Sequence, residues 1–512
     1  MCRIIKIVKR IIWILIYHIF VTLLLIGFVG DGLLSWYKET FGVTFREIIY
    51  TIKSPLKGAD THFLQNAVLS AMPAILIVIF IAVVLYIYKQ FLRKQIMGDE
   101  QNEVRRTIVT VIEWGVLTSA FVASFLYALF VLGKADGVLQ VSEFLEAKKH
   151  ETHIYEDYYV APDETEIISD KRMNLIHIYV ESMETTYASE EVGGKQKSVN
   201  YIPNLTKLAN ENISFSNDDK LGGFHCSTGT GWTAVALFAS ETGLPFCFPI
   251  EGNEDFGNRE AFAAGVVSLG DILESKGYYQ EFLCGSDATF GGRRAFYEQH
   301  GGFEIFDWYE AVNKGYVSED EFVWWGLEDK NLYKIAKDEL TRMSALDKPF
   351  NLTMLTVDTH HVDGWVCDLC GNEYSEQLAN VVKCADNQIY DFILWCEEQP
   401  WYDNTVIVIQ GDHPRMDTSL VGDLIYYDRT VYNCFINGKC NVNNVNRYNR
   451  ELLTMDLFPS ILSAMGYTIP DDKLGLGTNA FSDKKTLAEE LGYDYVNEET
   501  GKYSKYYIDA FS

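Results

Sequence analysis

Three long apolar stretches constrain the N-terminal part of this chain more than any other feature. They run over residues 11–29, 68–88 and 108–132, and each is about 20 residues long or longer. In a helix that rises about 1.5 Å per residue, such a stretch spans about 30 Å, the thickness of the hydrocarbon core of a bilayer. The sequence therefore predicts a transmembrane region over residues 1–132 with three spanning helices.

Basic residues predict the orientation of these helices, because Lys and Arg are retained on the cytoplasmic side. They precede the first stretch and fill the loop between the second and third: Arg3, Lys6, Lys9 and Arg10, then Lys89, Arg93, Lys94, Arg105 and Arg106. The loop over 31–67 and everything after about residue 133 are therefore expected outside the cytoplasm. A cleaved signal peptide is the alternative for the first stretch, and it would leave this location unchanged.

The outer loop and the rest of the chain complete the expected organisation. Amphipathic segments over 33–41 and 45–52 are expected either to lie in the membrane interface or to pack against the spans. A polar linker is predicted over 133–171, followed by one large domain over 172–512. The formal net charge of −28 argues against a nucleic-acid partner and against electrostatic binding to anionic lipid.

All the cysteines except Cys2 lie in the predicted extracytoplasmic region, where disulfides persist. We therefore expect disulfides among two groups: Cys367, Cys370, Cys384 and Cys396, and the pair Cys434 and Cys440. A zinc site is the alternative for the CxxC motif of the first group.

Apolar β-rich runs alternate with helical patterns in the large domain. The runs cover 174–180, 278–285, 350–357 and 404–410, and helical patterns lie near 203–211, 230–240, 268–276, 375–398 and 454–465. Strands that are apolar throughout and separated by helices indicate a parallel sheet that is covered on both faces. The predicted fold is a doubly wound, mostly parallel α/β fold.

Acidic and histidine side chains follow three of these runs: Glu181; Asp358, His360 and His361; Asp412 and His413. In doubly wound sheets the ligand binds at the carboxyl ends of the strands. Three strands thus deliver carboxylates and imidazoles to one edge, and this set of ligand types suits a divalent metal ion.

The segment STGTGWT, residues 227–233, places hydroxyl groups just before a helical pattern. A hydroxyl beside a bound metal becomes a better nucleophile, and free N–H groups at a helix N-terminus suit a phosphate or sulfate. The candidates are Ser227, Thr228, Thr230 and Thr233. The alternative is a simple N-cap with spare hydroxyl groups.

Six segments in order resemble the membrane-anchored phosphoglycerol transferases of bacterial envelopes. They are NLIHIYVESMETTY, GTGWTAVALFASETGLP, GSDATFGGRRAFYEQH, LTVDTHHVDG, TVIVIQGDH and TMDLFPSIL. The resemblance is greatest to the phosphoglycerol transferase I-like enzymes and weaker to the lipoteichoic acid synthases, all of the sulfatase and alkaline phosphatase superfamily. It covers residues 173–482 and extends to the multi-span anchor.

The resemblance implies roles for particular residues. Glu181, Asp412 and His413 would bind one divalent ion, with Mn²⁺ expected and Mg²⁺ or Zn²⁺ as alternatives. Thr230, aligned by counting ten residues back from Ser240, would complete the metal site as the nucleophile. His360 would contact the transferred phosphate.

The resemblance also implies substrate-binding roles for Arg293, Asp287 and His361. This part of the sequence departs from the synthases, which have a tryptophan where this chain has Gly291. Asp287 matches the family carboxylate only with a one-residue shift. An ordinary solvated basic pair is the alternative for Arg293 and Arg294, and His361 is alternatively structural.

The implied activity is metal-dependent transfer of glycerol phosphate from phosphatidylglycerol to an extracytoplasmic glycan or glycerol phosphate polymer. It would proceed through a phospho-threonine intermediate and release diacylglycerol at the bacterial cell membrane. A phosphoethanolamine transferase and a non-catalytic envelope binding protein of the same fold are the alternatives. Sulfatase chemistry by formylglycine is not expected, because the residues after Cys226 lack the required Pro or Ala and Arg.

Overall fold

The computed structural model divides the chain into two compact units. It describes Ile11 and residues 15–40, 44–53, 62–97, 103–163, 165–169, 172–248, 262–422, 424–439 and 445–511. One unit comprises Met1–Phe45 and Asp60–Ser142, and the other comprises Arg46–Ala59 and Glu143–Ser512. The second unit therefore includes a short segment from the loop between the first two predicted spans, and also most of the predicted linker.

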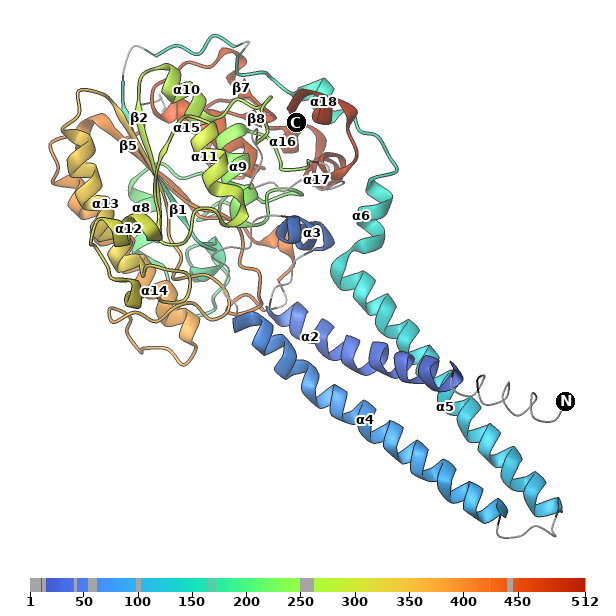
Figure 1. Ribbon diagram of the computed structural model, residues 1–512. Helices are drawn as coiled ribbons and strands as arrows, with labels where there is room; N and C mark the ends of the chain where they lie inside the picture. Colours follow the sequence, from blue (N-terminus) through green and yellow to red (C-terminus); the bar gives the residue numbers. More distant parts are fainter. Residues whose placement is uncertain are drawn as a thin grey trace. The chain divides into compact units, whose positions relative to one another are not determined.

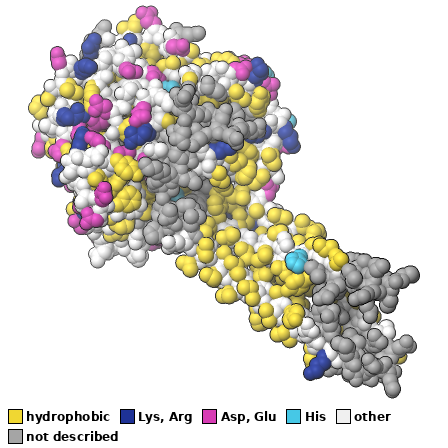
Figure 2. All heavy atoms as spheres, viewed as in Figure 1, with side chains coloured by type: hydrophobic (Ala, Val, Ile, Leu, Met, Phe, Trp, Pro, Cys, Tyr) yellow, Lys and Arg dark blue, Asp and Glu magenta, His cyan; other side chains and the backbone are white. Residues whose placement is uncertain are grey.

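The first unit consists of long apolar helices. Its elements are the π-helical turn η1 (Leu25–Val29), α2 (Gly30–Thr40), α4 (His62–Met97) and α5 (Glu103–Leu139). Three helical segments are long and apolar enough to cross a membrane: Leu15–Lys38, Gln65–Tyr88 and Thr107–Leu139. They overlap the three predicted stretches and extend beyond each of them at one end or both. Figure 2 shows hydrophobic side chains over the visible face of these helices, as expected for a membrane protein.

The second unit is built on a six-stranded sheet with the order β3-β2-β4-β1-β5-β6. The strands are β1 (Asn174–Val180), β2 (Tyr279–Cys284), β3 (Glu304–Phe306), β4 (Phe350–Leu355), β5 (Thr405–Gly411) and β6 (Asn433–Ile436). Neighbouring strands from β3 to β5 are parallel, and only β6 pairs antiparallel, with β5. This confirms the mostly parallel α/β fold; β3 and β6 were not among the predicted strands.

Helices cover both faces of this sheet, as Figure 1 shows. The α-helices outside the first unit, among the residues that the structure describes, are α3 (Phe45–Lys53), α6 (Val141–Ala147), α7 (Ile154–Tyr158), α8 (Pro203–Glu211), α9 (Thr233–Thr242), α10 (Leu269–Ser275), α11 (Arg293–Gln299), α12 (Trp308–Asn313), α13 (Asp329–Ser344), α14 (Gln377–Glu397), α15 (Leu457–Ala464), α16 (Leu487–Leu491), α17 (Tyr493–Gly501) and α18 (Lys505–Phe511), and not all of them contact the sheet. A short hairpin of β7 (Lys473–Leu474) and β8 (Gly477–Thr478) lies beside them.

Alternate residues of β1 enter different hydrophobic cores, which explains why the strand is apolar throughout. Ile176 and Ile178 pack with side chains of α8, α13 and α14. Leu175 packs with side chains of α10 and α15, and Tyr179 packs with side chains of α9 and α11. Every residue of β1 and of β5 is buried. This is the pattern of a strand that is buried on both faces of a doubly wound sheet.

A buried ionic network holds the loops that leave β1 and β5. Glu184 is fully buried and accepts hydrogen bonds from Nε and Nη2 of Arg429, at 2.9 and 2.5 Å. It also accepts a hydrogen bond from the backbone N–H of Arg415 at 3.0 Å, and the Arg415 side chain forms a two-pronged ion pair with Asp417, with both distances 2.6 Å. Removing one partner of such a network leaves a buried charge without compensation.

We predict that Glu184→Gln lowers the free energy of unfolding by about 3–5 kcal/mol, because the Arg429 guanidinium loses its buried counter-charge. Denaturant unfolding of the detergent-solubilised chain measures this. Glu190→Gln, the same change at an exposed position, is the control and should alter stability by no more than about 0.5 kcal/mol. Equal effects of the two substitutions would contradict a stabilising role for the network.

Candidate active site

The register of two neighbouring strands brings the predicted metal ligands together. β1 pairs with β5 so that Val180 lies opposite Gly411, and Glu181 and Asp412 are the next residues of each chain segment. Glu181, Asp412 and His413 are no more than 2 % exposed, and one ligand atom from each lies within 4.8 Å of the others. The structure therefore assembles all three of these predicted residues into one buried group.

The hydrogen bonds of this group suit a divalent cation. Oδ1 of Asp412 accepts hydrogen bonds from the backbone N–H groups of Ser182 and His413, both at 2.8 Å. Oδ2 is buried and accepts no hydrogen bond from the described residues. Burial and the charge of Glu181 raise the pKa of Asp412 to about 7. A buried carboxylate oxygen without a donor is costly, and a cation would satisfy it.

The imidazole of His413 is oriented to act as a ligand. Its Nδ1 donates a hydrogen bond to the carbonyl oxygen of Pro414 at 2.9 Å, which places the proton on Nδ1 and leaves the Nε2 lone pair available. Nε2 lies 3.6 Å from Glu181 Oε1 and 3.5 Å from Asp412 Oδ2. Carboxylate oxygen and imidazole nitrogen are common ligands of Mn²⁺ and Zn²⁺, so this donor set fits a divalent metal ion.

The hydroxyl that lies against this group belongs to Thr233. Helix α9 begins at Thr233, and Oγ1 lies 3.2 Å from both Glu181 Oε2 and His413 Nε2. The N-terminus of α9 therefore meets the edge of the sheet where β1 and β5 end. This is the arrangement that the sequence predicted for one of its four candidate hydroxyl groups.

Thr230, which the resemblance implied as the nucleophile, lies in the turn before α9. Its hydroxyl donates to the carbonyl oxygen of Ser227 at 3.0 Å and accepts from the backbone N–H of Ser227 at 2.8 Å. It thus closes the turn that precedes α9. The predicted helix began at residue 230, whereas α9 begins three residues later, at Thr233.

The glycines of this turn allow the close approach that it requires. Gly229 has a positive φ of +79°, and a Cβ there would lie 3.0 Å from the carbonyl oxygen of Phe246. A Cβ at Gly231 would lie 2.8 Å from the hydroxyl of Tyr426. The small residues that crowd the segment before α9 are therefore explained by the packing of the turn.

The loop after β4 presents His360 towards the same group. Although burial works in the opposite direction, the facing imidazoles of His360 and His413 hold the pKa of Glu181 below its usual range. Nδ1 of His360 is 2.7 Å from the carbonyl oxygen of His361, and its ring lies 4.9 Å from the ring of Trp325. His361 is buried and stacks on His360 at 4.2 Å. The structure therefore brings His360 to the site, with His361 packed against it.

The side chains of Arg293 and Asp287 form hydrogen bonds with neighbouring residues of their own loop. The Arg293 guanidinium is buried and donates to Ser286 Oγ and to the carbonyl oxygens of Asp287 and Phe290, at 2.9–3.0 Å. Oδ1 of Asp287 accepts from the backbone N–H of Thr289 at 2.8 Å. Arg293 is therefore not a solvated surface residue. The loop lies against α9, since a Cβ at Gly291 would be 3.3 Å from Cβ of Ala234.

Sequence reasoning missed a contribution from the outer loop. The Tyr50 hydroxyl of α3 donates to the carbonyl oxygen of Gly291 at 2.7 Å. Its ring centroid lies 5.5 Å from that of Trp232, the residue before Thr233, and 5.1 Å from that of Phe246. Arg46 donates to the carbonyl oxygen of Gly501 at 2.7 Å. The described residues from Arg46 to Lys53 therefore pack within the second unit. The other amphipathic segment lies in α2 of the first unit, where it packs against α4. The amphipathic patterns indicated buried faces but not their partners.

Comparison with known proteins agrees with the motifs. The family model described as Sulfatase matches residues 173–467. Phosphoglycerol transferase I from Escherichia coli strain 536 and from strain SMS-3-5 are each 30% identical over 370 residues, which cover 70% of this chain and 46% of the relative. The chain thus spans about half the length of the curated relatives it matches. The predicted resemblance to the phosphoglycerol transferases is confirmed.

Two solved structures are also similar. One is the lipoteichoic acid synthase LtaP from Listeria monocytogenes, with a TM-score of 0.48 and 18% identity, covering 66% of this chain and 91% of that chain. The other is the lipooligosaccharide phosphoethanolamine transferase A from Neisseria meningitidis, with a TM-score of 0.48 and 14% identity, covering 86% of this chain and 83% of that chain.

We predict that Gly229→Ala lowers the free energy of unfolding by about 1–3 kcal/mol, because Ala is strained at positive φ and its Cβ meets the Phe246 backbone. The control is Gly277→Ala, at a φ of +83° with no atom within 4 Å of the new Cβ. It should cost about 1 kcal/mol, since it bears only the conformational strain. Thermal unfolding measures both, and identical losses would show that the Phe246 contact is harmless.

Proposed function

The chain belongs to the sulfatase family, and we propose that it transfers glycerol phosphate from phosphatidylglycerol to an extracytoplasmic glycan or polymer acceptor. The observation that carries the proposal is the position of Thr233 Oγ1, 3.2 Å from both Glu181 and His413 at the start of α9. The likeness to phosphoglycerol transferase I supports glycerol phosphate as the transferred group.

Glu181, Asp412 and His413 would hold one divalent ion, with Thr233 beside it. Mn²⁺ is the proposed ion, and Mg²⁺ or Zn²⁺ can use the same donors. Such an ion supplies Lewis-acid stabilisation of negative charge on the oxygens of the hydroxyl and the phosphoryl group.

In the first half-reaction, Thr233 Oγ1 forms a bond to phosphorus while the bond from phosphorus to the diacylglycerol oxygen breaks. The threonine proton leaves to water, and the departing oxygen takes a proton from water. The N-terminus of α9 carries partial positive charge and favours the anionic phosphoryl group at this position. Diacylglycerol is released, and glycerol phosphate remains on Thr233.

In the second half-reaction, a hydroxyl of the acceptor forms a bond to the same phosphorus and the bond to Thr233 Oγ1 breaks. Nδ1 of His360 lies 2.7 Å from the carbonyl oxygen of His361, which leaves Nε2 free to take the acceptor proton and release it to water, and Thr233 recovers a proton from water. The protonation states of Thr233 and His360 are thus restored, and His360 serves as a general base in the second step. Arg293, Asp287 and His361 are proposed to shape the substrate pocket through the loops that they hold.

The membrane anchor is consistent with a lipid donor. We propose that the second unit lies outside the cytoplasm of a bacterial cell membrane, as the distribution of basic residues predicts. The head group of phosphatidylglycerol lies at the membrane surface, and a tether keeps the second unit at high effective concentration there.

We predict that Thr233→Ala lowers the rate of transfer at least about 1,000-fold, because it removes the nucleophile. Thr233→Ser, which keeps a hydroxyl, should retain measurable activity. Thr230→Ala is the matched control, and its activity should stay within about tenfold of wild type, because that hydroxyl only closes the turn. The assay uses the full chain in detergent with Mn²⁺ and head-group-labelled phosphatidylglycerol, and thermal unfolding checks that each variant is folded.

Mass spectrometry of the protein after the first half-reaction identifies the modified residue and the transferred group. Glycerol phosphate on the peptide that contains Thr233 is the expected adduct. An adduct on Thr230 would overturn the choice of nucleophile, and transfer of phosphoethanolamine from its own lipid would overturn the donor. Folded protein that binds Mn²⁺ but forms no adduct with either lipid would indicate a binding protein of the same fold.

A further inference from the structure

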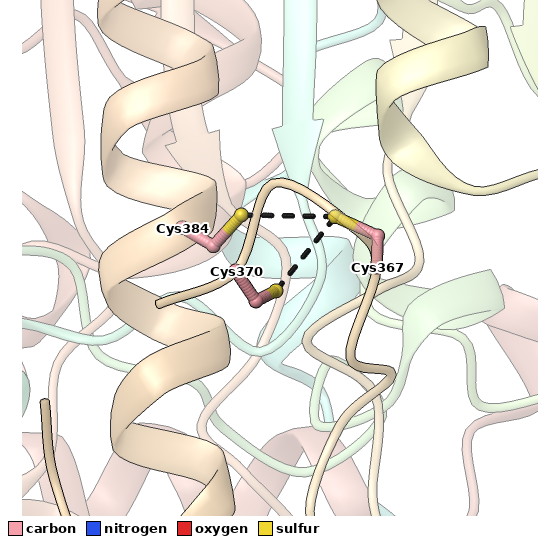
Figure 3. Close-up of side chains that lie close together, drawn as sticks. All are labelled: Cys367, Cys370 and Cys384. Atoms are coloured by element: carbon pink, nitrogen blue, oxygen red, sulfur yellow. Dashed lines mark hydrogen bonds between the residues drawn. The ribbon is translucent and has the colours of Figure 1, made fainter. Parts of the chain in front are cut away.

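Three cysteines converge next to the loop that carries His360, and the proposed reaction does not use them. Cys367 and Cys370 lie in the segment between β4 and α14, and Cys384 lies on α14 (Figure 3). The Sγ atom of Cys367 is 3.7 Å from that of Cys370 and 3.8 Å from that of Cys384. All three sulfur atoms lie within 4.8 Å of one another.

These distances distinguish between the two chemistries that the sequence left open for this motif. A disulfide requires sulfur atoms about 2.05 Å apart. A tetrahedral zinc ion with zinc–sulfur bonds of about 2.3 Å holds its sulfur ligands about 3.8 Å from one another. The observed separations match the zinc geometry. Among the described cysteines all thiols are free, which corrects the expectation of disulfides there, and Cys440 lies outside the described residues.

The local structure directs all three thiols to one point. The backbone N–H of Cys370 donates to the carbonyl oxygen of Cys367 at 3.1 Å, and this turn brings the two thiols of the CxxC motif together. Cys384 faces them from the buried side of α14. Nε2 of Gln388, one helical turn later, donates to Cys384 Sγ at 3.3 Å. Hydrogen bonds from neighbouring side chains of this kind orient metal ligands.

We propose that Cys367, Cys370 and Cys384 bind a zinc ion, with a water molecule as the fourth ligand. Cys367 and Cys384 are each 4 % exposed, whereas Cys370 is half-buried, so one side of the cluster is open to solvent. Thiolates select zinc over manganese and magnesium. The chain would therefore hold two metal sites of different preference, one of sulfur ligands and one of oxygen and nitrogen ligands.

The position of the cluster gives the zinc a structural role. The segment that contains Cys367 begins at the end of β4 and folds back on itself: the N–H of Gly364 donates to the carbonyl oxygen of His360 at 3.1 Å, and the N–H of Trp365 donates to that of Asp358 at 2.7 Å. Joining Cys367 and Cys370 to α14 through a metal would fix the far end of this segment. His360 and His361 would thereby be held in place.

Metal analysis of the full chain purified in detergent tests the proposal without measuring activity. Wild-type protein from cells grown with zinc should contain at least one equivalent of zinc per chain. The Cys384→Ser and Cys367→Ser variants should each contain about one equivalent less. Cys396→Ser, which changes another buried cysteine of α14, is the control and should keep the zinc. Asp412→Asn should also keep the thiolate-bound zinc, so loss in that variant would assign the ion to the other site.

Thiol accessibility in the wild-type protein tests the proposal even if a cysteine variant fails to fold. The three thiols should resist alkylation in the native protein and become reactive together after treatment with a zinc chelator. Replacement of zinc by cadmium should produce an ultraviolet sulfur-to-cadmium charge-transfer band. Two thiols that stay blocked after chelation and are released by a reductant would instead demonstrate a disulfide. Zinc-free protein with three reactive thiols would also overturn the proposal.

Discussion

The in-register pairing of β1 with β5 is the constraint on which the candidate site depends. It places Glu181 beside Asp412 at the carboxyl end of the sheet, and His413 follows on the same segment. Two acids buried together with an imidazole carry a large desolvation cost when their charge is not compensated, so they favour a bound divalent ion. The ionic network of Glu184, Arg415 and Arg429 then holds the loops that leave these two strands.

Other elements converge on that point because of how each one begins or ends. Helix α9 begins at Thr233, which brings a hydroxyl and a helix N-terminus to the group. The segment after β4 carries His360 there, and Cys367 and Cys370 of the three-cysteine cluster lie further along the same segment. The site thus depends on four segments that are distant in sequence, and its precision depends on how each connecting loop is held.

The sheet and the strand-end residues could be predicted from the sequence, because apolar strands and the polar residues that follow them obey simple rules. Glu181, Asp412 and His413 were found in this way. Thr233 could not be separated from Thr230, because the distinction lies in which hydroxyl closes the turn on Ser227. The hydrogen bonds of Arg293 to carbonyl oxygens of its own loop could not be predicted either, because they depend on loop geometry and not on a periodic sequence pattern. For the cysteines, the compartment favoured disulfides, and only the sulfur separations argue otherwise.

Tyr50 belongs by sequence to the segment between the first two spans, yet it contributes to the packing around Trp232 and Phe246. The second unit is therefore discontinuous along the chain. A shortened protein that starts after the last span would lack this aromatic ring and expose an apolar surface beside Thr233. During biosynthesis, the residues around Tyr50 emerge long before the sheet is synthesised, so the second unit completes its core around a segment that was made much earlier.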